Sequence, residues 1–356
     1  MRIALLPFNV ASDITNRVIY LNQIKDIEAK AFIIPQSQKI DYSNCELLPS
    51  GINSRNVFIK GLAILKYLYK LRLILKWADI IHWYWDFQYL PLIRMPIEYW
   101  LIKYYRKPGF IVWCGSEIRN PIIDSKINPY YSNVFNSGIY EYNFESAKRS
   151  NRTQYYFQKL GFTPLVFIGM DHYINKEYFK DVKRIFQVIN VSKFEPKYPN
   201  VKLGEIVNIV HSASVTGGKG TEFILKAISK LEIKYKINFI LINNVERRIA
   251  LENVSMCDIF IDQLITGSHG TAAVEAMGFG KPVITYINPE IKKYYPIDLP
   301  IIEASPDNIE VVLEKIISNP ESLNLIGRNS RLYVEKYHDD TLNAKLLATY
   351  YKSKMI

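Results

Sequence analysis

Short apolar runs bounded by polar turns recur along the chain, and they alternate with longer segments whose apolar residues follow helical spacing. Apolar runs of about four to eight residues are typical of buried strands, and an i, i+3, i+4, i+7 spacing is typical of helices. Strands, several of them running into polar turns, are predicted at 3–8, 31–34, 78–86, 109–119, 164–169, 205–214, 238–242, 257–263, 283–284 and 301–303. Helices are predicted at 57–76, 139–160 and 222–231, from Thr271 onward, and within 306–318, 321–337 and 340–352.

This alternation occurs twice, on either side of a segment rich in proline and polar residues. Strands that alternate with helices form parallel sheets covered by helices. A chain of 356 residues is long enough for two domains, because single domains cluster near about 100–200 residues. We therefore predict an α/β protein with two Rossmann-like doubly wound domains facing a cleft. The first domain is expected at 1–188, a linker at 189–204 and the second domain at 205–356.

The segment 57–76 combines an apolar stripe with a basic side. The stripe is formed by Ile64, Leu68, Leu71 and Leu75. The basic residues that project mainly from the other side are Lys66, Lys70, Arg72 and Lys76. One interpretation is a domain helix with a solvated basic face. The other is a helix that faces an anionic membrane surface, and a second basic and aromatic segment at 94–107 favours it.

Composition narrows the classes of function. The hydrophobic content of 49% is that of a globular protein. The sequence contains no run of about 18 uninterrupted apolar residues, the length that would span a bilayer. The first apolar run is too short for a signal peptide. Cys45, Cys114 and Cys257 are too scattered for a disulfide framework or a zinc knuckle, which favours a reducing cytosol. The net charge of +11 fits an anionic partner, and it equally fits the lysine-rich bias of an AT-rich genome.

A glycine-rich turn near residue 270 is the strongest candidate site. Gly267 and Gly270 let a ligand approach the backbone. The helix that begins near Thr271 directs unpaired amides and the positive end of its dipole at the same place, so we expect an anion such as a phosphate to bind there. Glu275 lies about one turn into this helix, where a carboxylate can accept hydrogen bonds from the hydroxyls of a ribose.

A second turn suited to phosphate lies at 216–221. Here Gly218 and Gly220 flank Lys219 at the start of a helix. The spacing does not match a Walker A loop. The first strand does not lead into a G-x-G-x-x-G sequence either, and the first glycine of the chain is Gly51, so a nicotinamide-binding domain is excluded.

Further candidates follow the strands of the first half, because ligands bind at the carboxyl ends of parallel strands. They are Asn9, Ser12, His82, Cys114, Gly115, Ser116 and Glu117. Ser12 or Asp13 is also expected to cap a helix. His82 could equally be an ordinary strand-end histidine, and Glu117 could form a local ion pair with Arg119. Cys114 has no adjacent base in the sequence and is therefore a poor candidate for a nucleophile.

Residues 267–284 resemble the donor-site motif of the family 4 retaining glycosyltransferases, whose usual form is Glu, seven residues, Glu, then Ala-Met or Ala, a Gly and Pro-Val. Residues 219–220 resemble the Lys-Gly element of this family, and 257–263 resemble the strand before its donor turn. The segments 79–82 and 114–119 are similar to a strand and a turn of its first domain. The resemblance implies the GT-B fold, retention at the anomeric carbon, and no metal or other cofactor.

The resemblance also assigns roles and exposes departures. It implies that Glu275 holds the ribose of a nucleotide-sugar, that Lys219 neutralises the pyrophosphate, and that the last helix crosses back to the first domain. Three positions depart from the family pattern. Gly267 stands where the first acid is expected, Cys114 replaces a histidine that faces the donor sugar, and Ser214 lies nearest to the place of a missing arginine.

We therefore predict a cytoplasmic, membrane-peripheral glycosyltransferase of the hexosyltransferase type. It would move a sugar from a UDP- or GDP-sugar to a glycan or lipid-linked acceptor, in cell-surface polysaccharide, lipopolysaccharide or glycolipid synthesis. No nucleic-acid partner is expected. The candidate catalytic residues are Lys219, Glu275, His82 and Glu117. The candidate donor-binding residues are Ser214, Gly218, Lys219, Val245, Gly267, His269, Gly270, Thr271 and Glu275.

The candidate residues on the acceptor side are Asn9, Ser12, Cys114, Gly115 and Ser116. Two alternatives remain open. One is a sugar-nucleotide epimerase of the GT-B fold, which would share the donor site but need acid and base carboxylates. The other is a degenerate GT-B subunit without catalysis that binds a partner enzyme or the membrane.

Overall fold

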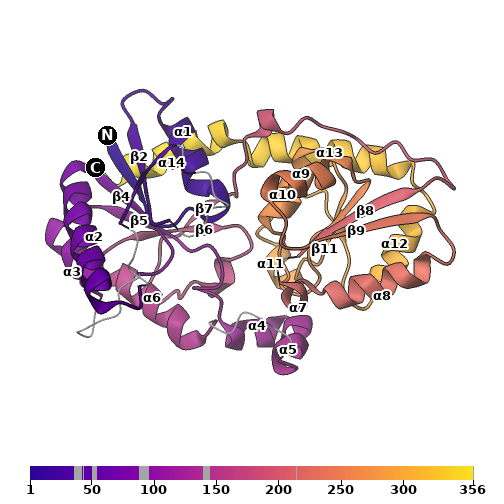
Figure 1. Ribbon diagram of the computed structural model, residues 1–356, viewed down its shortest axis with the longest axis horizontal. Helices are drawn as coiled ribbons and strands as arrows, with labels where there is room; N and C mark the ends of the chain where they lie inside the picture. Colours follow the sequence, from indigo (N-terminus) through magenta and orange to yellow (C-terminus); the bar gives the residue numbers. More distant parts are fainter. Residues whose placement is uncertain are drawn as a thin grey trace. The chain divides into compact units, whose positions relative to one another are not determined.

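The chain forms two compact units, each built on its own parallel sheet (Figure 1). The computed structural model describes residues 1–35, 42, 44–49, 54–87, 96–138, 145–213 and 215–355. The first unit comprises Met1–Arg119, Glu145–Val188 and Asp340–Ile356, and the second comprises Asn120–Phe144 and Ile189–Asp339.

The sheet of the first unit contains seven strands among the described residues. They are β1 (Arg2–Leu6), β2 (Glu28–Ile33), β3 (Cys45–Leu47), β4 (Ile80–Tyr84), β5 (Gly109–Val112), β6 (Thr163–Phe167) and β7 (Lys183–Ile185). All are parallel, in the order β3-β2-β1-β4-β5-β6-β7. The helical segments of this unit are η1 (Val10–Ser12), α1 (Asp13–Leu21), α2 (Val57–Trp77), α3 (Ile97–Tyr105), α6 (Ala147–Lys159), η2 (Asp171–Tyr173) and α14 (Asp340–Ser353).

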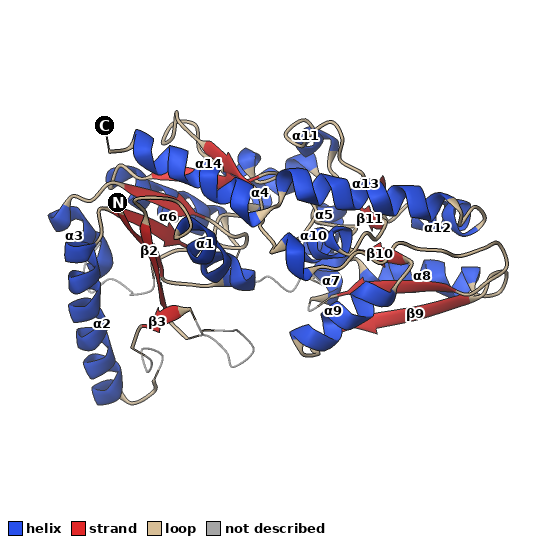
Figure 2. Cartoon of the chain, turned by 90° about the horizontal axis from the view of Figure 1, so that it is seen from above, coloured by secondary structure: helices blue, strands red, loops and turns tan. Residues whose placement is uncertain are grey.

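Strand alternation divides the first unit into three layers. Ala4 and Leu6 of β1 face a core shared with α2, α3 and α6. Ile3 and Leu5 face the opposite core, which is shared with α1 and α14. Because successive side chains of a strand point to opposite faces, a strand with apolar residues at every position must be covered on both sides. Figure 2 shows α2 and α3 running together along one edge of this unit.

The second unit repeats the architecture with five strands among the described residues. They are β8 (Val207–Ser212), β9 (Ile237–Ile242), β10 (Ile259–Ile261), β11 (Val283–Thr285) and β12 (Ile302–Glu303), all parallel in the order β12-β11-β10-β8-β9. The helical segments are α4 (Pro121–Ile127), α5 (Pro129–Asn136), η3 (Val191–Lys193), α7 (Thr216–Lys219), α8 (Thr221–Leu231), α9 (Arg247–Met256), α10 (Thr271–Gly278), α11 (Pro289–Lys292), α12 (Ile309–Ile317) and α13 (Ser322–Tyr337). Helices α8 and α12 pack on one face of the sheet, and α9, α10 and α13 pack on the other.

The predicted α/β class and most of the predicted elements are confirmed. Helix α2 starts at residue 57 and α10 at residue 271, as expected. The predicted helix at 139–160 is shorter, because α6 begins at Ala147 and residues 139–144 lie outside the described residues. Several short elements were not predicted, because they are short or lack a clear apolar period; they are β3, β7, α3, α4, α5, α9 and α11.

The two units differ from the predicted domain boundaries in two places. Segment 120–144 lies in the second unit although the chain returns to the first unit after it. The segment expected as a linker, 189–204, also belongs to the second unit, where Val191 and Phe194 are buried against α10 and α13. Helix α14 returns to the first unit, as the resemblance implied, where it packs against α1 and Tyr351 is completely buried.

The start of α1 is capped differently from the prediction. Ser12 has a left-handed conformation, with φ of 64°, and its side chain makes no capping hydrogen bond. Instead, Oδ1 of Asn9 accepts hydrogen bonds from the amides of Ile14 and Thr15, at 3.0 and 3.4 Å. The η1 turn places Asn9 ahead of the helix, so the asparagine takes the capping role. Asn9 is buried and serves local structure.

Helix α2 buries a face close to the predicted stripe. Leu71 and Leu75 are fully buried as expected, while Ile64 and Leu68 are half-buried. Ala63, Tyr67 and Ile74 complete the buried face. Helix α3 covers 97–105 of the second basic and aromatic segment, whose residues 94 and 95 lie outside the described residues. Of the helices that the structure describes, none has the length and apolar character needed to cross a membrane.

Candidate functional site

The order of strands in the second unit reverses beside β8. Strand β9 lies on one side of β8 and β10 lies on the other. In open α/β sheets, ligands bind outside the carboxyl ends of the strands at such a reversal. Two turns leave the sheet at this point. One follows β8 and leads into α7, and the other follows β10 and leads into α10.

These two turns meet at one carboxylate. The ammonium group of Lys219, at the end of α7, donates a hydrogen bond of 2.6 Å to Oδ1 of Asp262. The amide of Gly270, at the start of α10, donates a hydrogen bond of 2.6 Å to Oδ2 of the same residue. The structure therefore brings together the two segments that the sequence analysis assigned to phosphate binding.

The electrostatics of this cluster favour an anion. Burial would raise the pKa of Asp262, but Lys219 and the amide of Gly270 hold the pKa of that carboxyl below its usual value. Asp262 is therefore ionised, and it occupies the place at which a lysine and a helix start direct positive charge. A phosphate oxygen has the charge and hydrogen-bonding capacity to use the same donors.

Buried hydrogen bonds fix the floor of this cluster. His211 on β8 pairs through Nδ1 with the carbonyl of Ile261 at 2.8 Å, and through Nε2 with Oγ1 of Thr221 at 2.9 Å. Burial lowers the pKa of His211 to about 4. A neutral imidazole thus ties the start of α8 to β10. Gly218 is buried in the short helix α7, and Ser214 lies outside the described residues.

Glu275 pairs with an arginine that the sequence analysis did not assign to the site. Oε1 of Glu275 lies 2.6 Å from a guanidinium nitrogen of Arg247, which opens α9. Burial raises the pKa of Glu275, and Arg247 opposes this effect. Val245, the candidate contact for a nucleobase, is exposed in the loop just before α9. Val245, Arg247 and Glu275 thus come from the β9–α9 loop, α9 and α10.

Gly267 is a glycine for a reason different from the predicted approach of a ligand. Its φ is +81°, a conformation that side chains rarely adopt. A Cβ atom at this position would lie 2.8 Å from Cβ of Asn288 and 3.3 Å from Nδ2 of Asn128. The protein itself therefore fills the place where the family's first acid would project.

Both asparagines are held in position by hydrogen bonds to backbone carbonyls. Nδ2 of Asn128 donates to the carbonyl of Ile265 at 2.7 Å, and Nδ2 of Asn288 donates to the carbonyl of Ile127 at 2.9 Å. The backbone amide of Asn288 donates a hydrogen bond of 2.8 Å to the carbonyl of Gly267. Helices α4 and α5 thereby support the glycine-rich turn from outside the sheet, which explains why they belong to the second unit.

The remaining residues of the glycine-rich turn lie at the start of α10. Thr271 is the first residue of α10 and is half-buried, and Gly270 precedes it as the N-cap. His269 is buried, its ring lies 5.1 Å from that of Tyr295, and burial lowers its pKa. This environment gives His269 a packing role in the turn.

His82 lies in the core of the first unit. It is completely buried, its Nδ1 lies 2.5 Å from the hydroxyl of Tyr351, and its ring stacks on Tyr84. Burial, followed by the charge of Arg17, lowers the pKa of His82 well below its ordinary value. This environment favours the alternative interpretation of His82, an ordinary histidine at the end of a strand.

Glu117 stabilises its own turn. Its carboxylate accepts hydrogen bonds from the amides of Cys114 and Gly115. Burial raises the pKa of Glu117 to about 7. The expected pair with Arg119 is replaced by one between Arg119 and Glu145, at 3.0 Å. Burial and the carboxylate of Glu117 raise the pKa of the Cys114 thiol well above its ordinary value, which disfavours a thiolate. Ser116 is buried in the same turn.

Sequence reasoning missed four residues of the candidate site. They are Asp262, Arg247, Asn128 and Asn288. A weak signal existed for Arg247, because a basic residue in the first turn of a helix is unfavourable unless an acid lies nearby. The asparagines left no local signal. Among the residues whose positions are described, no group of three or more His, Cys, Asp or Glu side chains is placed to hold a metal ion.

Comparison with solved structures identifies the architecture. The chain contains two doubly wound parallel sheets, and the candidate site lies at the strand reversal of the second sheet. The whole chain aligns over nearly its full length with glycosyltransferase structures. The fold is the GT-B fold. No family model matches the sequence, and a search of curated proteins found no match either.

The similar structures have low sequence identity and full coverage. Sucrose-phosphate synthase from Thermosynechococcus elongatus aligns with a TM-score of 0.62 and 12% identity, over 99% of this chain and 98% of the other. HepE from Anabaena, in complex with UDP and glucose, aligns with a TM-score of 0.56 and 11% identity, over 99% and 100%. WaaG, a glycosyltransferase of lipopolysaccharide biosynthesis, gives 0.57 and 12%, over 98% of each chain.

A structure from another enzyme class has the same fold. UDP-GlcNAc 2-epimerase from Neisseria meningitidis, bound to UDP-GlcNAc, aligns with a TM-score of 0.52 and 13% identity, over 99% of this chain and 100% of the other. The likeness to these structures therefore shows the fold and does not select one reaction.

Proposed function

We propose that this protein is a retaining glycosyltransferase that uses a nucleotide diphosphate-sugar. The observation that carries the proposal is the convergence of Lys219, the amide of Gly270 and the start of α10 at the strand reversal of the second unit. The binding of UDP and glucose by HepE, a protein of the same fold, supports a nucleotide-sugar donor.

The site would act mainly by stabilising the departing diphosphate. Lys219 would supply a full positive charge, and Gly270 and Thr271 would supply the amides at the start of α10. Stabilisation of developing charge by preorganised donors is commonly the largest catalytic effect. Glu275 would accept hydrogen bonds from the ribose, and Arg247 would keep that carboxyl ionised despite its burial.

We infer a front-face displacement for the transfer step. The bond between the anomeric carbon and the phosphate oxygen breaks while the acceptor hydroxyl forms a new bond to the same carbon on the same face. The acceptor proton passes to the leaving phosphate oxygen, so that no side chain of the protein has to act as base and neither a metal nor another cofactor is required. Trapping of a donor analogue on a protein carboxylate would contradict this step.

The acceptor that we propose is a glycan, free or lipid-linked, and the transferred group is a hexose. The likeness to WaaG, whose function is in lipopolysaccharide biosynthesis, supports a role in making cell-surface polysaccharide, lipopolysaccharide or glycolipid. We place this reaction in the cytoplasm, where nucleotide-sugars are made. The candidate residues of the first unit, among them Gly115 and Ser116, would lie on the acceptor side.

Product analysis tests the proposed reaction. The purified protein is incubated with UDP- and GDP-hexoses and a panel of glycan acceptors, and the anomeric configuration of any product is read by proton NMR. We expect a product that keeps the anomeric configuration of the donor. The variant Lys219→Met should form no product, whereas Lys226→Met, which changes an exposed residue of α8, should form it like wild type. A product of inverted configuration would contradict the proposal.

The likeness to UDP-GlcNAc 2-epimerase makes an epimerase the second candidate. An epimerase would convert a UDP-sugar in the absence of any acceptor. Incubation of the protein with donor alone, followed by separation of the sugar products, distinguishes the two activities. The third alternative is a subunit without catalysis. It predicts that both activities are absent and that the donor binds weakly.

A further inference from the structure

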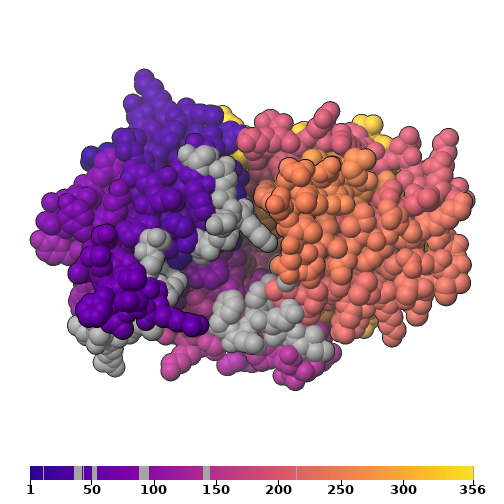
Figure 3. All heavy atoms as spheres, in the orientation of Figure 1, coloured from indigo at the N-terminus to yellow at the C-terminus, as the bar shows by residue number. Residues whose placement is uncertain are grey.

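Helix α2 is apolar on the side that faces away from the core of its unit. Its outer stripe follows helical spacing and consists of Phe58, Leu62, Leu65, Tyr69 and Leu73. These five side chains are between 43% and 89% exposed. A helix that buries one apolar face in the core and shows another to solvent requires a second apolar environment. Figure 3 shows α2, in dark violet, on the outer surface of the first unit.

The apolar surface continues onto α3. Trp100 is 49% exposed and Tyr104 is 79% exposed. A groove of about 440 Å³ between the two helices is lined by both of these residues together with Tyr69 and Arg72. The guanidinium of Arg72 donates to the hydroxyl of Tyr105 at 3.3 Å, so the two helices are also joined by a polar contact.

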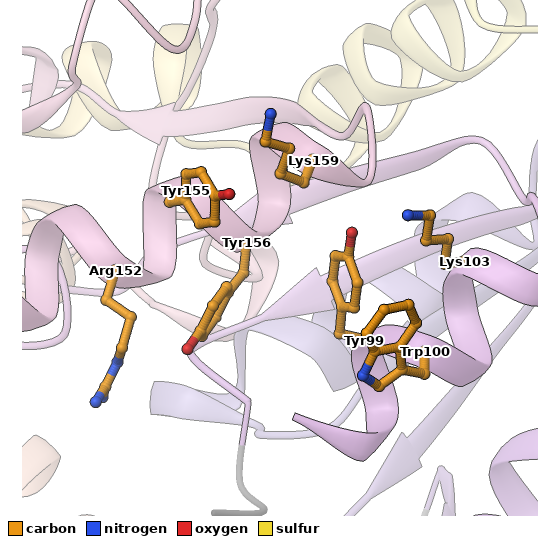
Figure 4. A pocket seen from close by; sticks show the side chains of 7 residues that line it. All are labelled: Tyr99, Trp100, Lys103, Arg152, Tyr155, Tyr156 and Lys159. Atoms are coloured by element: carbon orange, nitrogen blue, oxygen red, sulfur yellow. The ribbon is translucent and has the colours of Figure 1, made fainter. Parts of the chain in front are cut away.

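A second groove joins α3 to α6. It has a volume of about 630 Å³, and aromatic and basic side chains from the two helices line it from opposite sides (Figure 4). Trp100 lines this groove as well as the first, so the surface is continuous across the three helices. Lys103 and Lys159 line it and are exposed, with the Nζ atom of Lys103 lying 5.5 Å from the ring of Trp100.

The helices of this surface carry an excess of positive charge. Helices α2, α3 and α6 contain ten basic residues and a single acidic residue, Glu98, which is buried. Exposed basic residues flank the outer stripe at Lys60, Lys66, Arg72 and Lys76. Lysine and arginine can extend their charged ends to a polar boundary while their stems lie along apolar surface.

We propose that α2, α3 and α6 form a lipid-docking face that binds the surface of an anionic bilayer. The outer stripe of α2 would enter the boundary between headgroups and acyl chains, and Trp100 and Tyr104 would lie at the same depth. Lys103 and Lys159 would pair with lipid phosphates in the groove between α3 and α6. The net positive charge of the face selects an anionic lipid surface over a second copy of this basic chain. The proposal does not depend on the proposed transferase activity.

Vesicle binding tests the apolar part of the lipid-docking face. The full chain is sedimented with phosphatidylcholine vesicles that contain either no phosphatidylglycerol or about one quarter of it. We expect binding to the anionic vesicles that weakens about tenfold or more in Phe58→Asp/Leu65→Asp. The matched control, Leu325→Asp/Leu332→Asp, changes two exposed leucines of α13 and should bind like wild type. Circular dichroism and thermal unfolding establish that each variant is folded.

A second pair of variants tests the charge. Lys103→Glu/Lys159→Glu should weaken binding about tenfold or more, whereas Lys226→Glu/Lys345→Glu carries the same charge change elsewhere and should have a much smaller effect. Added salt should weaken wild-type binding. Equal binding to neutral and anionic vesicles, or equal losses in test and control variants, would overturn the proposal. So would self-association without vesicles that is lost in Phe58→Asp/Leu65→Asp, because a second copy would then cover this face.

Discussion

The ammonium group of Lys219 lies 2.6 Å from Oδ1 of Asp262, a carboxylate that is fully buried at the end of β10. The other oxygen of Asp262 accepts the amide of Gly270. This aspartate therefore occupies the donors that we assign to the diphosphate. A nucleotide would have to share Lys219 with Asp262 or take it over.

Asp262→Asn tests this competition. The amide cannot accept from both donors as the carboxylate does, so we expect the free energy of unfolding to fall by about 2–3 kcal/mol, less than for a fully buried pair because Lys219 reaches solvent. Saturating UDP or GDP should raise the melting temperature of the variant more than that of wild type, since Lys219 no longer has to leave a carboxylate. Thermal unfolding with and without nucleotide measures both effects, and a variant as stable as wild type would contradict this view of the cluster.

Gly267→Ala tests the close approach of Asn128 and Asn288. The positive φ and the contact at 2.8 Å together should cost about 2–4 kcal/mol of unfolding free energy. Gly204 is the matched control, because its φ is +87° and a Cβ there would meet no atom within 4 Å. Gly204→Ala should cost only about 1 kcal/mol. Urea denaturation of both variants gives the comparison, and equal costs would mean that the asparagines do not restrict this position.

Introducing the first acid of the family 4 motif at position 267 should fail for the same reason. We expect Gly267→Glu to be at least as destabilised as Gly267→Ala and to bind nucleotide-sugar no more tightly than wild type. A gain in donor affinity or transfer rate in this variant would show that the turn can rearrange to admit a side chain.

Arg247→Ala should make nucleotide binding depend on pH. Burial raises the pKa of Glu275 and Arg247 counteracts it, so removing the arginine raises the pKa further and leaves more of the carboxyl protonated at pH 6 than at pH 8. The affinity of the variant for UDP or GDP should therefore increase from pH 6 to pH 8 by more than that of wild type. Arg248→Ala, whose side chain is exposed and pairs with Glu252, is the control. Calorimetric titrations at the two pH values decide the point.

His211 should make stability fall in acid. Its folded pKa is about 4, below the value near 6.5 of an unfolded histidine, so the folded state favours the neutral ring. The stability that this provides is complete above about pH 6.5 and is lost as the pH falls towards 4, with an upper bound of about 3 kcal/mol. The difference in unfolding free energy between wild type and His211→Gln, measured from pH 4 to 8, should shrink in acid. A difference independent of pH would contradict the assignment.

The sequence predicted those features that depend on local pattern. The apolar runs located most strands, and the glycines near Lys219 and Gly270 located the two turns that meet at the strand reversal. The two turns meet there because of the topology of the sheet, since each turn leaves the carboxyl end of one of two neighbouring strands.

Long-range contacts explain what the sequence did not predict. Asn128 is 137 residues from Ile265, the residue whose carbonyl it binds, so no local pattern could place α4 and α5 beside the glycine-rich turn. The contacts of Asp262 with Lys219 and Gly270 were not predicted, because the sequence 257–263 indicates a strand and gives no sign of a binding residue. His82 and Glu117 carry types of side chain that suit catalysis, and only their burial shows that they serve local structure.

Calorimetric titration of UDP and GDP into wild type and Glu275→Ala tests the central claim most directly. We predict that one of the two nucleotides binds wild type and that the variant loses about tenfold or more of the affinity, as expected for lost hydrogen bonds to a charged group. Glu232→Ala, an exposed glutamate at the end of α8, should bind like wild type. Failure of both nucleotides to bind wild type, or equal affinity in Glu275→Ala, would contradict the assignment of this turn as the donor site.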